Sequence, residues 1–374
     1  MTMSLWISTL LVALTLLAGF VALRRSKRPR DQIAPDSTTQ VAALRAMQAP
    51  EEEVPAADAA PDAAAAAAAA ALNVRAETLR SLREVAFGIT LPPVGTLVLP
   101  DDEFNLHVGT LLGNIVDKPN YAPRRPMQLP KLMQAINDES ASRRAFSQII
   151  AGDPALAGNL LRLANSPIYR HSPEPIESLD RAVDMLGTEG LRSMIAAALL
   201  QPVFRVSGGS YAQFGDVVWE HSLYAAAAAE GHALLVEHTD PFAAQLLALV
   251  MGLATIVVFS VAQSEFHTRQ RAPEAAIIAS LVDVHAISVA RQIAASWELS
   301  ERVDTALAEQ LGKQSAPASA LGRSLRYGEF IGALAVLRGR GVIDDPTAQV
   351  VLQSADAPAS ANERIWAKLG LTPR

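Results

Sequence analysis

The sequence predicts an all-α protein, and three observations carry that prediction. Half of its 374 residues are apolar and only 5% are aromatic, and alanine is abundant, a balance that favours helices over sheets. Apolar residues recur at helical spacing, whereas no run of alternating Val, Ile and Thr bounded by turn residues stands out. We expect a membrane helix, a disordered Ala/Pro tether and a multi-helix domain with a short helical extension on each side.

The first predicted element is a transmembrane anchor. Residues Leu5 to Leu23 form an uncharged apolar stretch, long enough at about 1.5 Å per residue to cross about 30 Å of hydrocarbon. Five basic residues follow it directly, namely Arg24, Arg25, Lys27, Arg28 and Arg30. A cleaved signal peptide, the main alternative, carries its charge before the apolar run. The positive-inside rule therefore predicts that residues 1–30 form a single-pass anchor, with the rest of the chain in the cytoplasm.

Two regions with fewer recognisable sequence features follow the anchor. Residues 31–73 are rich in Ala, Pro, Asp and Glu and include an unbroken alanine run from Ala63 to Ala71. This composition buries too little apolar surface for a core, so it predicts a disordered linker, with a helix across the alanines as an open alternative. Residues 74–126 are expected to form a helical extension of the domain that follows. An amphipathic pattern covers Arg75–Phe87, and a second helical pattern covers Glu103–Ile115.

The most informative stretch of the chain is a short helix with both ends marked. Asp153 can accept hydrogen bonds from the free amides of the first turn, which makes a cap a better interpretation than a catalytic acid. Pro154 sits where its missing N–H costs nothing. The predicted apolar face of this helix consists of Leu156, Leu160, Leu163 and Ala164.

Turn residues end this helix and introduce the next one. Asn165 and Ser166 suit a chain that leaves a helix, because the following Pro167 disfavours α geometry for Ser166. We expect both residues to be structural rather than ligand-binding. The next helix is predicted to begin at Ser178, with Leu186 facing inward and Gly187 as a left-handed cap.

Together these residues resemble a known family. The run I-x-x-D-P-A-L-x-x-x-L-L-R-L-A-N-S, which includes Leu161, and the later run I-x-S-L-x-R-A-V-x-x-L-G-x-x-x-L-R are similar to the HDOD domain. This family is a non-enzymatic relative of the HD-superfamily phosphohydrolases, used in bacterial signalling. The resemblance implies an HDOD domain over residues 127–325, followed by a C-terminal helical extension over 326–374.

The second half of the predicted domain carries further residues of the family motif. Trp219, His221 and Ser222 resemble the family's W-x-H-S helix. The segment from His285 to Trp297 resembles a later motif, in which Ser300 replaces a proline. We expect all of these side chains to be structural.

The resemblance also locates a missing catalytic pair. Catalytic HD proteins carry G-L-L-H-D-I-G where this chain has Ala248–Ala254, so the His-Asp pair falls on Met251 and Gly252. HD hydrolysis needs a divalent metal, and Met and Gly supply no hard donor for one. We therefore expect no catalytic residue, no metal ligand and no cofactor. The alternatives are a divergent phosphohydrolase with His221 and His285 as remnants of its site, or a nucleotide-binding sensor.

A second apolar run has to be distinguished from the anchor. Leu246–Ala262 is uncharged and would pass a hydropathy test for a membrane span. However, Asp240 and Pro241 begin it like a soluble helix, and no basic cluster flanks it. A helix that is apolar all round also fits the centre of a large helical domain, so we predict a buried core helix.

Composition excludes several function classes. A formal charge of −6 argues against a general nucleic-acid-binding surface, and the absence of cysteine excludes disulfides, Cys-ligated zinc and thiol catalysis. The expected function is a non-catalytic signalling or scaffold role at the cytoplasmic face of a bacterial inner membrane. The expected partner is an unidentified protein, and the sequence predicts no oligomeric state.

The topology prediction can be tested with a reporter fusion. Alkaline phosphatase fused to the C-terminus should be inactive, because the reporter would remain in the cytoplasm. Removing residues 1–30 should release a soluble protein, because Leu246–Ala262 is expected to be core. Enzyme activity from the fusion in intact cells would contradict the predicted orientation.

Overall fold

The computed structural model describes residues 60–91, 102–118, 154–166, 210–312 and 319–371, with isolated positions between 121 and 200. Within these residues every regular element is a helix, which confirms the all-α prediction. The Leu5–Leu23 anchor, and with it Asp153, Leu186 and Gly187, lie outside the described residues. Residues 75–374 form one compact unit, distinct from residues 1–74.

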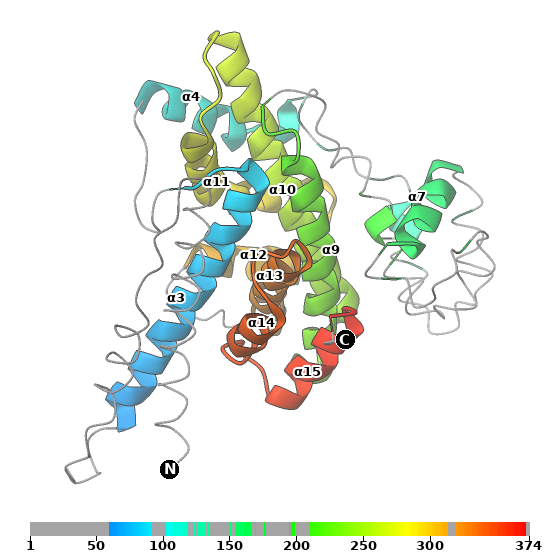
Figure 1. Cartoon of the computed structure of the whole chain (residues 1–374). Coiled ribbons are helices and arrows are strands. Elements are labelled where there is room, and N and C mark those ends of the chain that lie inside the picture. Colours follow the sequence, from blue (N-terminus) through cyan, green and yellow to red (C-terminus); the bar gives the residue numbers. More distant parts are fainter. Residues whose placement is uncertain are drawn as a thin grey trace, which may run out of the picture. The chain divides into compact units, whose positions relative to one another are not determined.

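The described helices are drawn in Figure 1, coloured along the chain. In order they are α3 (Ala60–Phe87), α4 (Asp102–Gly113), α7 (Pro154–Ala164), α9 (Phe214–His232), α10 (Pro241–Thr268), α11 (Ala275–Ser296), α12 (Glu301–Ala308), α13 (Ala320–Gly339), α14 (Asp345–Leu352) and α15 (Ala359–Lys368). Short helical segments occur at η1 (Ile115–Asp117), η3 (Ala233–Glu237) and η4 (Glu309–Leu311). At the centre, α9 packs against both α10 and α13, and α10 packs against α11.

The long apolar helix α10 is a core helix of this unit. Among the described residues, α10 and α11 are the two helices long and apolar enough to cross a membrane. In α10, however, 83% of the most apolar window is buried against the rest of the protein. The Asp240 side chain caps the helix by accepting a hydrogen bond from the N–H of Ala243, at 3.0 Å. The prediction that Leu246–Ala262 is buried core is therefore confirmed.

Helices α9 and α13 approach unusually closely, through small residues on both sides. A Cβ atom added to Gly332 would lie 2.6 Å from the backbone N of Ala225. One added to Gly328 would lie 2.5 Å from the carbonyl oxygen of Ala225 and 2.7 Å from Cβ of Ala229. The two backbones are thus in direct contact, which leaves no room for a larger side chain at either glycine.

Helix α3 differs from the expected disordered linker and agrees with the open alternative of a helix across the alanines. It begins at Ala60, inside the region expected to be a disordered linker, so the alanine run and Arg75–Phe87 form one continuous helix. Alanine has the highest intrinsic helix propensity, and this favours helix continuation across Ala63–Ala71. The second helical pattern is confirmed by α4, which spans Asp102–Gly113.

The last turns of α3 pack on the core helices. The Phe87 ring lies against those of Tyr211, Phe214 and Phe259, with centroid distances of 5.1, 4.8 and 6.3 Å. The amide of Gln213 donates a hydrogen bond to the carbonyl of Val85, at 2.8 Å. This end of α3 is therefore an integral part of the compact unit.

The C-terminal helices are joined to the core by buried polar contacts. On α9, His232 lies 3.1 Å from the Ser324 hydroxyl of α13 through Nδ1 and 3.2 Å from the Asp356 carbonyl through Nε2. The Tyr327 hydroxyl of α13 donates to Oδ1 of Asn362 in α15, at 2.7 Å. Residue 325 lies inside α13, so the segment expected as an extension shares a helix with the domain.

The α9–α13 contact can be tested with a pair of glycine substitutions. Gly332→Ala should destabilise the protein by about 1–3 kcal/mol, because the new methyl group would overlap the backbone of Ala225. Gly158→Ala in α7 should instead stabilise it by about 0.5–1 kcal/mol, because a Cβ there meets nothing within 4 Å. Urea unfolding followed by circular dichroism measures both. Equal effects of the two substitutions would contradict the close approach.

Candidate functional site

Helix α7 presents the first group of motif residues. It begins at Pro154 and ends at Ala164, as the sequence predicts. The face predicted to be apolar is buried, with Leu156, Leu160, Leu163 and Ala164 each at most 2% exposed. Leu161 is half-buried. This part of the motif builds a packing surface, and it contains no group with evident catalytic chemistry.

Asn165 acts as a clamp after α7. Its Nδ2 donates to the carbonyls of Leu161 and Ile176, both at 2.9 Å, and its Oδ1 accepts from the N–H of Ile176 at 2.8 Å. The side chain pairs with the backbone of Ile176 as the backbone of a neighbouring β-strand would. It thereby holds Ile176, eleven residues further along the chain, beside the end of α7. Both polar atoms of the amide are engaged by backbone, which supports a structural role for Asn165. The adjacent Ser166 is half-buried.

His221 lies on α9 and is directed at α13. The ring is buried, and Nε2 lies 3.0 Å from the backbone carbonyl of Glu329. A carbonyl can only accept, so Nε2 carries the proton and is not free to bind a metal in this arrangement. Beside it, the Ser222 hydroxyl donates to the Val218 carbonyl at 2.7 Å, and Trp219 is half-buried.

His285 lies on α11 and contacts a different helix. A Cβ added to Gly109 of α4 would lie 3.3 Å from Cε1 of His285, so the ring packs directly on that glycine. Burial lowers the pKa of His285, which favours the neutral ring. The two motif histidines thus face different partners, with His221 on α13 and His285 on α4.

The position of the missing pair lies in the middle of α10. Gly252 is buried and Met251 is half-buried. Across the described part of the chain, no three His, Asp or Glu side chains are grouped closely enough to hold a metal ion. The residues present at Met251 and Gly252 therefore do not fit the metal centre of an HD hydrolase.

The remaining motif residues have packing and capping roles. Trp297 is buried at the end of α11, and its Nε1 donates to the carbonyl of Pro123 at 3.2 Å. Glu309 follows α12, and its carboxylate accepts from the N–H and the hydroxyl of Ser319. Ser319 in turn caps α13 by accepting from the N–H of Gly322, at 3.0 Å. The sequence did not indicate Glu329 and Glu309 as partners of these elements, because their contacts cross between helices.

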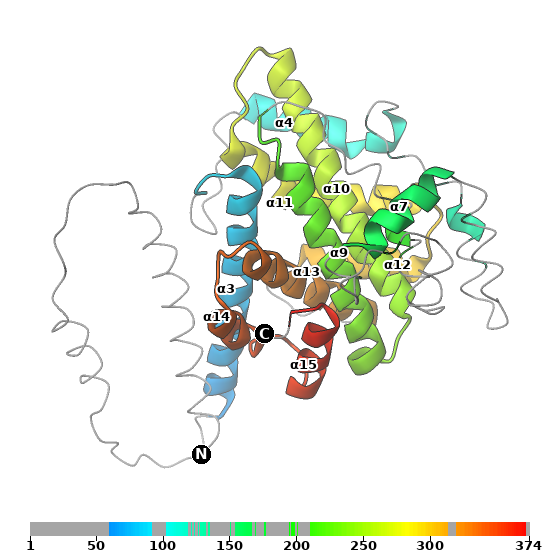
Figure 2. The same ribbon diagram turned by 45° about the vertical axis from the view of Figure 1, so that its right-hand side comes forward.

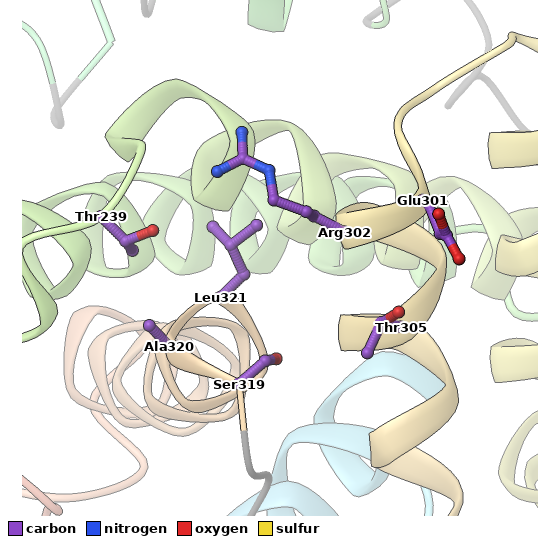
Figure 3. Close-up of a pocket in the computed structure, with 7 residues that line it drawn as sticks. All are labelled: Thr239, Glu301, Arg302, Thr305, Ser319, Ala320 and Leu321. Carbon is purple, nitrogen blue, oxygen red and sulfur yellow. The ribbon is translucent and has the colours of Figure 1, made fainter.

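An open pocket lies among the residues that the structure describes. It has a volume of about 350 Å³ and lies between the start of α10, α12 and the start of α13 (Figure 3). Its lining comprises Thr239, Glu301, Arg302, Thr305, Ser319, Ala320 and Leu321. Arg302 is 3.6 Å from the Asp240 carboxylate and is mostly exposed to solvent. The lining includes neither His221 nor His285, and its Ser319 hydroxyl is engaged by the Glu309 carboxylate and by the cap of α13.

Comparison with known proteins gives a family. The family model of the HDOD domain matches residues 122–311. No curated protein sequence matches. A crystal structure of an HDOD domain protein with unknown function from Geobacter sulfurreducens is similar at 20% identity and a TM-score of 0.48, covering 72% of this chain and 95% of that one.

Two structures from Shewanella amazonensis SB2B are also similar. One is a provisionally assigned metal-dependent phosphohydrolase, with 18% identity, a TM-score of 0.46 and coverage of 71% of this chain and 99% of that one. The other is a provisionally assigned phosphohydrolase, with 20% identity, a TM-score of 0.46 and coverage of 69% and 95%. At such scores these similarities carry no inference about ligands or activity.

The clamp role of Asn165 leads to a graded prediction. Asn165→Ala removes all three backbone hydrogen bonds, and each group left without a partner costs about 1–3 kcal/mol. Asn165→Asp should cost at least as much as Asn165→Ala, because its second oxygen would face the carbonyl oxygens of Leu161 and Ile176, to which Nδ2 now donates. Denaturant melts measure the two free energies of unfolding. A ligand-binding role without structural function would leave both unchanged.

Proposed function

Because the chain belongs to the HDOD family, we propose that it is a non-catalytic signalling scaffold that acts through protein–protein contacts at the cytoplasmic face of a bacterial inner membrane. One observation carries the non-catalytic part of this proposal. The position of the His-Asp pair holds Met251 and Gly252, in the middle of a core helix. Neither residue can hold a hard divalent metal or deliver a proton.

The surroundings of the lost pair support the same conclusion. Gly252 is buried in α10, so an aspartate there would bring a charge into an apolar helix. An unpaired buried charge costs several kcal/mol, and it would need a metal or a cation to offset it. The Nε2–H of His221 donates a hydrogen bond to the Glu329 carbonyl, and the ring of His285 packs on Gly109. The histidines that would complete a metal centre therefore serve other contacts.

The membrane and partner parts of the proposal are supported by the sequence. The apolar Leu5–Leu23 run with its basic flank favours a single-pass inner-membrane anchor. The net charge of −6 argues against nucleic acid as the partner. A helical domain without a catalytic or metal-binding centre acts most simply by binding another protein.

The absence of turnover is testable with the purified full-length chain. We expect no stoichiometric divalent metal by elemental analysis and no hydrolysis of cyclic dinucleotides, nucleotides or model phosphodiesters. His221→Ala should lower the free energy of unfolding, because it removes a buried ring and its hydrogen bond to the Glu329 carbonyl. A matched control is His267→Ala, which removes an exposed histidine from the last turn of α10.

The same measurements distinguish the competing functions. Manganese or iron near one per chain, with activity lost in His221→Ala or His285→Ala, would replace the proposal with a divergent phosphohydrolase. Stoichiometric nucleotide binding without turnover would replace it with a nucleotide sensor. The scaffold role itself requires a partner, which in-cell crosslinking with the anchor intact would capture.

A further inference from the structure

His232, in the last turn of α9, is the most deeply buried histidine among the residues that the structure describes. It is 1% exposed, and its ring stacks on that of Tyr327 in α13, with a centroid distance of 4.3 Å and an interplanar angle of 26°. Its Nδ1 lies 3.1 Å from the Ser324 hydroxyl, and its Nε2 lies 3.2 Å from the Asp356 carbonyl. The ring therefore joins α9, α13 and the turn between α14 and α15.

The partners of His232 suit the neutral form of its ring. The Asp356 carbonyl can only accept a hydrogen bond, so Nε2 carries the proton. The lone pair of Nδ1 then accepts from the hydroxyl of Ser324, a fully buried residue. A second proton on Nδ1 would take this acceptor from the hydroxyl and would place a charge in a site without water. Both effects disfavour the charged ring.

The charged groups around the ring do not reverse this preference. Among the described residues they are Arg323 of α13, Glu237 of η3 and Asp356 of the turn before α15. Burial is the main cause that lowers the pKa of His232, and the charge of Arg323 acts in the same direction. The Asp356 carbonyl and the two carboxylates act in the opposite direction without cancelling the effect of burial. Glu237 is itself paired with Arg323, at 2.6 and 2.8 Å.

The C-terminal segment that His232 contacts, residues 345–371, covers an apolar surface. The large apolar side chains that it buries around α15 are those of Ile365, Trp366 and Leu369. Ile365 lies on the last turn of α9, because a Cβ added to Gly231 would lie 3.0 Å from its Cγ1. The Tyr327 hydroxyl adds a polar link by donating to Asn362, at 2.7 Å. Since Gly231 and His232 are adjacent, the apolar and the polar contacts of the C-terminal segment meet at one point on α9.

We propose that His232 is a proton-controlled latch, which fastens the C-terminal segment to α9 and α13 and releases it in mild acid. Release uncovers the last turn of α9 and the apolar face of α15, and so creates a surface for contact with another protein. The inference goes beyond the scaffold function and does not depend on it, because the release can be measured without a partner.

The direction of the pH effect follows from which state binds the proton more tightly. In the released state His232 meets water and has the ordinary histidine pKa of about 6.5. Above about pH 6.5 the ring is neutral in both states, and the latch is fully effective. Below this pH the released state binds a proton that the fastened state does not, so release becomes up to about tenfold more favourable per pH unit. The effect levels off at the lowered pKa of the fastened ring.

Hydrogen exchange on the full-length chain in a mild detergent tests this proposal. Exchange of α14 and α15 peptides is followed from neutral pH to mild acid, and each rate is divided by the rate of an unstructured peptide at the same pH. The resulting ratio should be constant above about pH 6.5 and should rise up to about tenfold per pH unit below it. A ratio that stays constant throughout would overturn the proposal.

Three variants separate the latch from general effects of acid. His232→Gln retains an amide that can donate to the Asp356 carbonyl but does not titrate, so the pH dependence should disappear. Tyr327→Phe removes the link to Asn362 and should speed exchange by the same factor at every pH. His267→Gln removes an exposed histidine of α10 and should keep the wild-type response. A pH dependence that persists in His232→Gln, or that is lost in either control, would contradict the proposal.

A direct titration of the ring requires no variant. NMR of the wild-type protein labelled at histidine should give His232 a lower titration midpoint than the exposed His267, because the fastened ring resists protonation. A midpoint equal to or above that of His267 would overturn the latch, since acid would then leave the fastened state unchanged or strengthen it.

Discussion

The direct backbone contact between α9 and α13 is the constraint on which the rest of the unit depends. Gly328 and Gly332 place α13 against the alanine face of α9, and an added Cβ at either position would overlap Ala225. With α13 held this close, the Glu329 carbonyl reaches the ring of His221, and Ser324 reaches His232. The C-terminal helices then attach through contacts with α13 and α9. Small residues thus set the distance between α9 and α13, and polar side chains add hydrogen bonds between the two helices.

This arrangement also decides what the motif histidines can do. In a hydrolase of the HD superfamily, His and carboxylate groups converge on one metal. Here His221 is engaged by α13 and His285 by α4, and the residues between them in the motif are Met251 and Gly252. The positions of the motif are retained as helix-packing points. A family fold can be kept while the residues at such positions differ between its members.

Sequence patterns located helices well where the signal lay within the helix itself, as periodicity and capping residues do. Periodicity and caps placed α4, α7 and the buried helix α10 close to their observed bounds. For α3 the composition of the segment suggested disorder, whereas the open alternative of a helix across the alanines agrees with the observed helix. Candidate-site contacts such as His221 with Glu329 could not be predicted, since these residues are 108 positions apart. Periodicity shows which face of a helix is buried but not which helix covers it.

The alanine face of α9 has a consequence for synthesis on the ribosome. Helix α9 ends at His232, whereas its partner α13 begins only at Ala320. The face of α9 that packs on α13 therefore stays uncovered while α10 to α12 are synthesised. Exposed apolar surface on such an intermediate promotes aggregation. Alanines offer little of that surface, and four of them, Ala225, Ala226, Ala228 and Ala229, become almost fully buried in the finished protein. This face of α9 therefore adds little adhesive surface to the nascent chain before α13 emerges.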